Sequence, residues 1–369
     1  MKKLSATICK NVKGFFAMTC FMLLSSSHLM VAQTAIQLKQ QSLAKWHIGA
    51  AQYSGITALG NNRYALVSDK EPADGFFIFK IEQSKLTGQI THVQLEEFRG
   101  NKKAKVDAKG ICIRDCEGVA YFPTKNTIFI SGEGDQKILE YSLATGQPTG
   151  RELNVPTAFA LANTYPNYGF EALCYDSKHH LFWTTSESTL RSDGYAVSAL
   201  TPATKANVLR LQAFDDQLQP TLQYAYRMDN RQISNFGKIY VNGVTDLTAL
   251  PDGRLLVLER EANITPAGLG SKVICKLFVV NPSTGKAISS TTKLDNEDDT
   301  IFLKKQLLTE WQTAVHPFKI DFANYEGMCL GQTLHDGRQT QLLVNDSQGG
   351  YHKGPFRLKD YIKVIVIGH

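Results

Sequence analysis

The sequence predicts an all-β fold, a single closed β-propeller built from four-stranded blades. One hairpin pattern recurs along the chain, further short strands follow each copy, and helical periodicity is scarce. Four short antiparallel strands per repeat are typical of a propeller blade. The copies begin at Ser54, Asp115, Gly169, Gly243 and Tyr325. We therefore count five blades, and a sixth, irregular blade has room only in the inserts at 188–205, 229–242 and 291–324.

The repeated hairpin is clearest at residues 115–133, "DCEGVAYFPTKNTIFISGE". An acid or small residue precedes a short strand, a polar turn follows, and an apolar strand then ends in an acid. Other copies turn at Asn61-Asn62 and at Pro251-Asp252-Gly253, which favour chain reversal. No linker-like stretch separates the copies, so residues 33–369 are expected to form one domain.

The strands that follow each hairpin complete its blade. "GFFIFKIE" and "ITHVQLEEF" follow the first hairpin, and comparable pairs follow the next three. Only "YIKVIVIGH" follows the fifth, so the last blade lacks one strand. We expect the N-terminal segment 43–49, "LAKWHIG", to pair beside it, because this closes the ring and covers a sheet edge.

In four hairpins a small residue stands three positions after the first acid. These residues are Ala120, Cys174, Ala249 and Cys329. Small side chains suit strands that crowd together near a common axis. The two cysteines are therefore interpreted as small core residues, not as nucleophiles.

Acidic residues at both open ends of the hairpins are expected to converge at the mouth of the central channel. The start of each innermost strand and the end of the second strand open on the same face of a propeller. The first group is Glu117, Glu171, Asp246 and Glu326, and the second is Asp69, Glu133, Glu187, either Glu259 or Glu261, and Asp346. Crowded carboxylates repel one another and have raised pKa values unless a positive charge lies among them.

Two sources of that positive charge are open. A hard cation, Ca²⁺ or another divalent ion, prefers oxygen ligands, and Arg260 and Lys70 could instead pair with the acids and make the ring structural. The expected metal ligands are Asp69, Glu117, Glu171, Asp246, Glu261, Glu326 and Asp346. The expected catalytic ligands or bases are Glu117, Glu171, Asp246 and Glu326. The expected substrate contacts are Arg260, Glu133, Glu187 and His352.

The first 32 residues read as a secretory signal peptide. Basic residues precede a short apolar run, and small residues near Ala32 suit cleavage, so a secreted or periplasmic protein is expected. The run is too short to span a bilayer comfortably, and no later stretch is apolar enough. This segment holds four lysines and no acid, so the formal charge of +6 falls to about +2 in the mature chain. No nucleic-acid partner is indicated, and a monomer is expected.

The mature chain keeps five cysteines, too few for a disulfide-dense scaffold. Cys112 and Cys116 either form a small local bridge beside Glu117 or remain free thiols. No second Cys or His pair accompanies them, so a zinc site is not indicated.

Four stretches resemble the bacterial "esterase-like activity of phytase" family. They are "DCEGVAYFP…FISGE", "NYGFEALCYD…WTTSE", "GVTDLTALPDGRLLVLERE" and "NYEGMCL…LLVNDS", and the resemblance runs over about residues 50–368. It implies a propeller in the periplasm or outside the cell, with phosphoester or ester hydrolysis. Basic residues that could hold a phosphate are Arg191, Arg231 and Arg260. A G-x-S-x-G elbow and an H-E-x-x-H motif are absent from the sequence.

The sequence therefore predicts an exported hydrolase that acts on a small phosphorylated or ester substrate at an acidic, metal-assisted channel mouth. One alternative is a non-catalytic propeller that binds a partner protein, a glycan or a cation on the same face. Another is a lactonase-like propeller, which would also place a divalent ion on an acid cluster.

Overall fold

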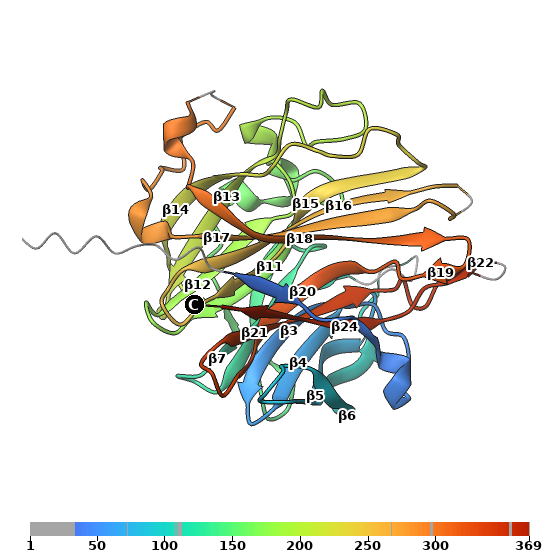
Figure 1. The fold of residues 1–369 in the computed structure, drawn as a ribbon. Helices are drawn as coiled ribbons and strands as arrows, with labels where there is room; N and C mark the ends of the chain where they lie inside the picture. Colours follow the sequence, from blue (N-terminus) through green and yellow to red (C-terminus); the bar gives the residue numbers. More distant parts are fainter. Residues whose placement is uncertain are drawn as a thin grey trace, which may run out of the picture. The chain divides into compact units, whose positions relative to one another are not determined.

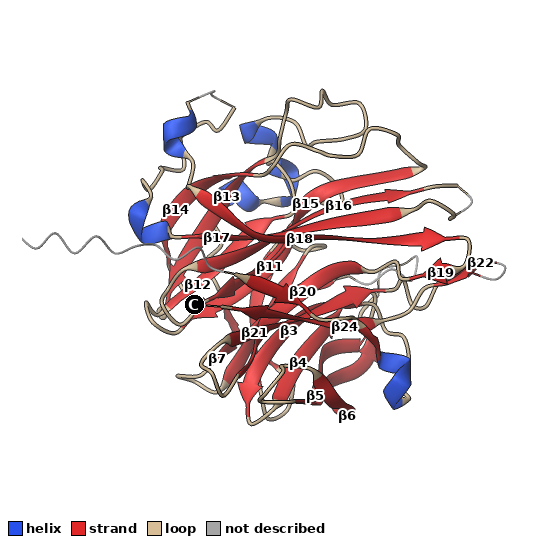
Figure 2. Ribbon diagram, viewed as in Figure 1, coloured by secondary structure: helices blue, strands red, loops and turns tan. Residues whose placement is uncertain are grey.

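The computed structural model describes residues 34–368, except 72, 107, 109–112, 267, 296, 297, 354 and 355. Within these residues the regular structure is β-strand, with six short 3₁₀ helices and no α-helix (Figure 2). Five antiparallel sheets of four or five strands follow one another along the chain. No helix in the described part of the chain is long and apolar enough to cross a membrane.

The first two blades come from the N-terminal half of the described chain (Figure 1). The first has β3 (Tyr53–Gly60), β4 (Arg63–Ser68), β5 (Ala73–Gln83) and β6 (Ile90–Ala104). The second has β7 (Cys116–Phe122), β8 (Thr127–Gly132), β9 (Lys137–Ser142) and β10 (Pro148–Glu152). Two 3₁₀ helices, η2 (Thr157–Phe159) and η3 (Leu161–Asn163), lead from the second blade to the third.

The third and fourth blades follow the same order. The third has β11 (Phe170–Asp176), β12 (Leu181–Ser186), β13 (Val208–Asp215) and β14 (Pro220–Arg227), with η4 (Arg191–Asp193) after its second strand. The fourth has β15 (Ile239–Ala249), β16 (Leu255–Ile264), β17 (Lys272–Val280), β18 (Lys305–His316) and β19 (Lys319–Ile320), with η5 (Pro282–Thr284) and η6 (Asp299–Ile301) before β18. The insert at 291–324 therefore supplies the outer strand of this blade and not a sixth blade.

The fifth blade combines both ends of the described chain. It has β20 (Asn324–Thr333), β21 (Gln339–Asp346) and β24 (Tyr361–Ile367), and its outer positions are taken by β1 (Ala35–Gln37) and β2 (Gln41–Ser42). A separate small hairpin, β22 (His352–Lys353) and β23 (Phe356–Arg357), lies between β21 and β24 in the chain. The five-bladed count from the sequence is confirmed.

The expected closure of the ring by the N-terminus is confirmed, but the expected segment was wrong. Ala35 pairs with Ile367, and Gln41 pairs with Ile362, so the closing strand lies before residue 43. Residues 43–49 instead begin with the 3₁₀ helix η1 (Leu43–Trp46). The Leu43 N–H donates to the Asp360 carbonyl, and the Leu43 side chain is buried, which turns the chain away from the sheet edge.

Each pair of neighbouring blades encloses its own hydrophobic cluster, and five such clusters complete the ring. Between the second and third blades, the Phe129 and Phe182 ring centroids are 4.6 Å apart. Alternate residues of β21 face opposite neighbours: Leu342 packs towards the first blade and Leu343 towards the fourth. The innermost strands β3, β7, β11, β15 and β20 contact one another in turn, and β20 contacts β3. The ring is thus closed, and its axis is lined by the starts of the hairpins.

Candidate metal centre at the channel mouth

The five innermost strands share a β-bulge at the channel mouth. In each hairpin the pairing register shifts at or beside the same position, which inserts an extra residue. A bulge bends the strand and re-aims a side chain. The residues at this position are Ser54, Glu117, Glu171, Thr245 and Glu326. All five are polar, and we refer to them as the first tier.

A second tier comes from the ends of the second strands. Glu133 N–H donates to the Asp115 carbonyl at 2.8 Å, and Glu187 N–H donates to the Gly169 carbonyl at 2.7 Å. The same register applies in the other three blades. The second tier is therefore Asp69, Glu133, Glu187, Arg260 and Asp346. Four blades supply an acid here, and the fourth blade supplies a guanidinium.

The expectation that Asp246 begins the fourth blade's innermost strand at the channel mouth was wrong, because β15 begins at Ile239 and the residue at its bulge is Thr245, one position before Asp246. Thr245 Oγ1 donates to the Tyr325 carbonyl, just as Ser54 Oγ donates to the Cys116 carbonyl, so these two hydroxyls are equivalent. The Asp246 carboxylate instead accepts the N–H groups of Leu247 at 2.8 Å and Met328 at 2.6 Å. It joins the innermost strands of the fourth and fifth blades and does not belong to the acid cluster.

Glu261 and Glu259 also lie outside the mouth. The Glu261 carboxylate accepts N–H bonds from Gln232 and Ile233, so it holds the insert at 229–242 in place. Glu259 binds the Lys305 ammonium at 2.5 Å. Both flank Arg260 in β16, and neighbouring residues of a strand point to opposite faces. Because Arg260 points towards the channel, the two glutamates point away from it. Glu261 was expected to be a metal ligand, but the structure does not bring it to the mouth.

Among the residues that the structure describes, eight acids and two cations lie at the mouth. The acids are Asp69, Asp115, Glu117, Glu133, Glu171, Glu187, Glu326 and Asp346. Lys70 Nζ lies 2.9 Å from Asp69 and 2.6 Å from Asp115. Arg260 pairs with Glu187 and lies 3.8 Å from Glu326. Arg260 was expected to contact substrate, but in the structure it is buried among these carboxylates.

Two first-tier glutamates have no such partner. Among the residues that the structure describes, no hydrogen-bond donor or cation lies on the carboxylate of Glu117 or Glu171. Both residues are more than nine-tenths buried, at 6% and 9% exposure. Burial, and then the nearby carboxylates, raise the pKa of both glutamates well above the usual range. Burial likewise raises the pKa of Glu133 to about 7.

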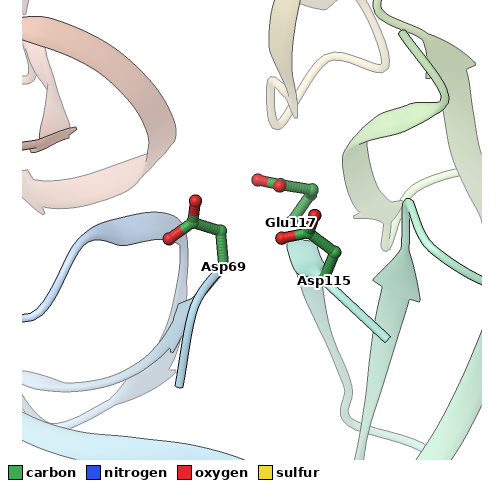
Figure 3. A group of neighbouring side chains, drawn as sticks. All are labelled: Asp69, Asp115 and Glu117. Atoms are coloured by element: carbon green, nitrogen blue, oxygen red, sulfur yellow. The ribbon is translucent and has the colours of Figure 1, made fainter. Parts of the chain in front are cut away.

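These acids form two groups that fit a hard cation. In Asp69, Asp115 and Glu117, and again in Glu117, Glu133 and Glu171, one oxygen of each carboxylate lies within 4.8 Å of the others. Figure 3 shows the first group: Asp69 comes from the end of β4, Asp115 and Glu117 come from the start of β7, and their carboxylates face a shared space. Asp69 Oδ1 is buried there, and none of the described residues gives it a hydrogen bond. Oxygen donors left free in this way match the ligands that Ca²⁺ prefers.

Asp115 was missed as a site residue, although the sequence carried a signal for it. Asp115 and Glu117 are two positions apart, and residues at this spacing share one face of a strand. Asp115 has a left-handed backbone with φ of 52°, a conformation that Asp tolerates better than most residues. His352 lies in β22, but its side chain is outside the described residues, as is Cys112. Cys116 carries a free thiol.

Comparison with known proteins agrees with this architecture. Residues 48–348 match the family model described as phytase-like, esterase-like activity of phytase. The chain belongs to this family. The search of curated proteins gave no match.

Two solved structures align with most of this phytase-like chain at low identity. The PQQ-bound aldose sugar dehydrogenase from Streptomyces coelicolor is 9% identical with a TM-score of 0.43, and the alignment covers 91% of this chain and 98% of that one. An endo-arabinase from Bacteroides thetaiotaomicron is 11% identical with a TM-score of 0.45, and covers 88% and 95% of the two chains. At such identities no chemistry is transferred from either structure.

Proposed function

We propose that this protein is an exported hydrolase that cleaves a phosphoester or a carboxyl ester at the acidic channel mouth, with a divalent cation bound there. The observation that carries the proposal is the pair of carboxylate groups that share Glu117. Both unpartnered glutamates, Glu117 and Glu171, belong to the group that contains Glu133. Uncompensated buried carboxylates are costly, and a bound cation would relieve that cost.

The two groups suit different roles. Lys70 already binds Asp69 and Asp115, so the first group is partly neutralised. Glu117, Glu133 and Glu171 have no contacting cation within the described chain, so this group is the preferred site for Ca²⁺. A cation there would polarise a phosphoryl or carbonyl oxygen and lower the pKa of bound water. Arg260 offsets part of the remaining negative charge, because it pairs with Glu187 and lies near Glu326.

The deciding experiment measures hydrolysis of a generic phosphoester and a generic carboxyl ester, each with Ca²⁺ and with a chelator. We expect activity that requires the cation and a higher melting temperature when Ca²⁺ is present. Glu171→Gln should weaken both effects while the protein still folds. Glu152→Gln, which changes a surface acid of β10, is the matched control and should change neither.

The results also separate the hydrolase from the binding protein. Stabilisation by Ca²⁺ without hydrolysis of either ester would favour a propeller that binds a cation or a partner on this face. An unchanged melting curve with Ca²⁺ and with chelator would remove the metal from the proposal and leave the acid ring structural.

We further infer export, with removal of the first 32 residues near Ala32; residues 1–33 lie outside the described part of the chain. The composition of this leader supports the proposal. Mass measurement of the protein from its native host should give a chain that begins near Gln33. A cytoplasmic chain that still begins at Met1 would contradict it.

A further inference from the structure

A cavity of about 570 Å³ lies beside the acid cluster. Glu133, a member of the preferred cation site, lines it together with Tyr165 and Arg191. Leu161 and Pro166 add apolar surface, and Leu161 is 55% exposed. Nothing in the function proposed above uses this cavity beyond Glu133.

Two connecting segments build the cavity, residues 153–169 before β11 and residues 187–207 after β12. They are bonded to each other and packed on the core. The Asn163 side chain accepts the Ser192 N–H at 2.9 Å and donates to Ser192 Oγ at 2.9 Å. Phe159, in η2, is buried and stacks on Phe170 of β11 with ring centroids 5.3 Å apart. The cavity walls are therefore anchored to the propeller, as a preformed ligand site requires.

The Arg191 side chain is held in one orientation, and its positive charge can still bind an anionic ligand. Its guanidinium carbon lies 4.2 Å from the centre of the Tyr165 ring, and its Nε donates to the Thr164 carbonyl at 3.0 Å. Tyr165 is itself fixed, because its hydroxyl donates to the Gly194 carbonyl at 3.0 Å. Within the described residues no carboxylate lies at ion-pair distance from Arg191, whereas nearby Arg210 is neutralised by Asp193 at 2.6 Å.

We propose that this cavity binds a second group of the substrate, an oxyanion that is not the group cleaved. The phosphate or carboxylate would accept hydrogen bonds from the terminal nitrogens of Arg191, which suit planar two-point contacts. An apolar portion would lie against Leu161 and Pro166, and the bond to be cleaved would lie at the Glu133 end. The substrate class is thus an ester with a remote anionic group and an apolar body, an inference that rests on the proposed function.

The test compares esters that differ only in the remote group. Phenyl acetate, 4-carboxyphenyl acetate and 4-phosphonophenyl acetate, with the matching phenyl phosphates, would be assayed with Ca²⁺. Arg191→Gln should raise KM for the anionic esters about tenfold or more through loss of charge-assisted hydrogen bonds, with little change in kcat. KM for the neutral ester should not change. An equal effect on neutral and anionic esters, or no effect, would overturn the proposal.

Two further variants test whether the rise in KM comes from the loss of charge alone or from the loss of any stacked arginine. Arg191→Lys keeps the charge but loses the planar fork, and it should restore only part of the affinity. Arg227→Gln removes another arginine that stacks on an aromatic ring, Phe302, and that pairs with Asp299, but that does not line this cavity. It should leave KM for all the esters unchanged.

If no ester is hydrolysed, the proposed hydrolase is contradicted, but the cavity can still be tested by direct binding. Calorimetry with benzoate and with phenylphosphonate would then measure the cavity itself. Binding that is lost in Arg191→Gln and kept in Arg227→Gln would support the cavity, and the tighter probe would identify the oxyanion. Absence of binding by the unmodified protein, or binding that survives Arg191→Gln, would overturn it.

Discussion

The chemical identity of each first-tier residue decides where negative charge gathers at the mouth. The Ser54 and Thr245 hydroxyls donate to carbonyls of the next blade, at 2.7 Å and 3.2 Å, and so bind the innermost strands together. Glu117 and Glu171 stand at the equivalent position but make no such bond within the described residues. The same bulge therefore joins neighbouring strands in the first and fourth blades and brings carboxylates together in the second, third and fifth blades.

Asp246→Asn should separate a structural acid from the acids of the proposed cation site. Both Asp246 oxygens accept backbone N–H groups, and an amide would turn an NH₂ group towards one of those donors. We expect a loss of about 2 kcal/mol in the free energy of unfolding, because a buried N–H is left unsatisfied. Denaturant titration measures the loss. The Ca²⁺-dependent rise in melting temperature should persist, unlike in Glu171→Gln, and its disappearance would place Asp246 back among the ligands.

The sequence identified most of the clustered acids because acids recur at the ends of strands. It placed Asp246 incorrectly because a β-bulge in β15 adds one residue without changing the apolar pattern, and it placed Glu261 incorrectly because an acid stands directly beside Arg260. Both acids stand one position from the residue that actually faces the mouth, Thr245 and Arg260 respectively. An alignment of the repeats by residue type places the nearest acid at the mouth. The hydrogen-bonding register instead places a threonine and an arginine there.

In four of the five innermost strands a small residue directly follows the bulge, and this lets neighbouring strands approach one another closely. Gly118 follows Glu117, and a Cβ on Gly118 would lie 2.6 Å from the Glu171 carbonyl oxygen and 2.6 Å from the Leu173 nitrogen. Gly327 follows Glu326 and meets the Ser54 carbonyl oxygen in the same way, at 2.7 Å. The absence of a side chain at these positions sets the spacing between blades and hence between the carboxylates.

Gly118→Ala should therefore push β7 and β11 apart. The added methyl meets backbone atoms, which cannot rotate away, so we expect a loss of about 2 kcal/mol in the free energy of unfolding. Because Glu117 and Glu171 lie on these two strands, Ca²⁺ should also bind more weakly, as a calcium titration would show. Gly49→Ala is the matched control, since no atom lies within 4 Å of its Cβ. Equal stability in both variants would argue against close packing as the determinant of the mouth.

At the scale of elements, turns and alternation predicted the hairpins well, since both are local properties of the sequence. The closing strand was assigned to 43–49 because that segment follows the leader and contains apolar residues. The structure uses the shorter segment 35–42, in which Ile36 remains half exposed. An outer strand needs little hydrophobic patterning, because it covers a sheet edge mainly with backbone hydrogen bonds.

The whole ring concentrates negative charge that Lys70 and Arg260, the two cations described at the mouth, balance only in part. Burial raises the pKa of Glu133 and of Asp346 to about 7, and it raises the pKa of Glu117, Glu171 and Glu326 as well. The folded protein therefore binds protons at these groups more strongly than the unfolded chain does. Stability from this source is present at acidic pH and is lost as pH rises from the ordinary carboxyl range through the raised pKa values.

In the presence of a chelator, the melting temperature should consequently fall between about pH 5 and pH 8. For Glu133 alone, a rise from 4.5 to about 7 corresponds to about 3 kcal/mol. Calcium should reverse the trend, because it binds the ionised carboxylates of the folded state and competes with protons for them. Thermal denaturation at several pH values, with Ca²⁺ and with chelator, should show a stabilisation by Ca²⁺ that grows towards pH 8. The growth should be smaller in Glu171→Gln. A chelated protein that becomes more stable as pH rises over this range would show that the acids at the mouth are already compensated within the chain, and the cation site would be abandoned.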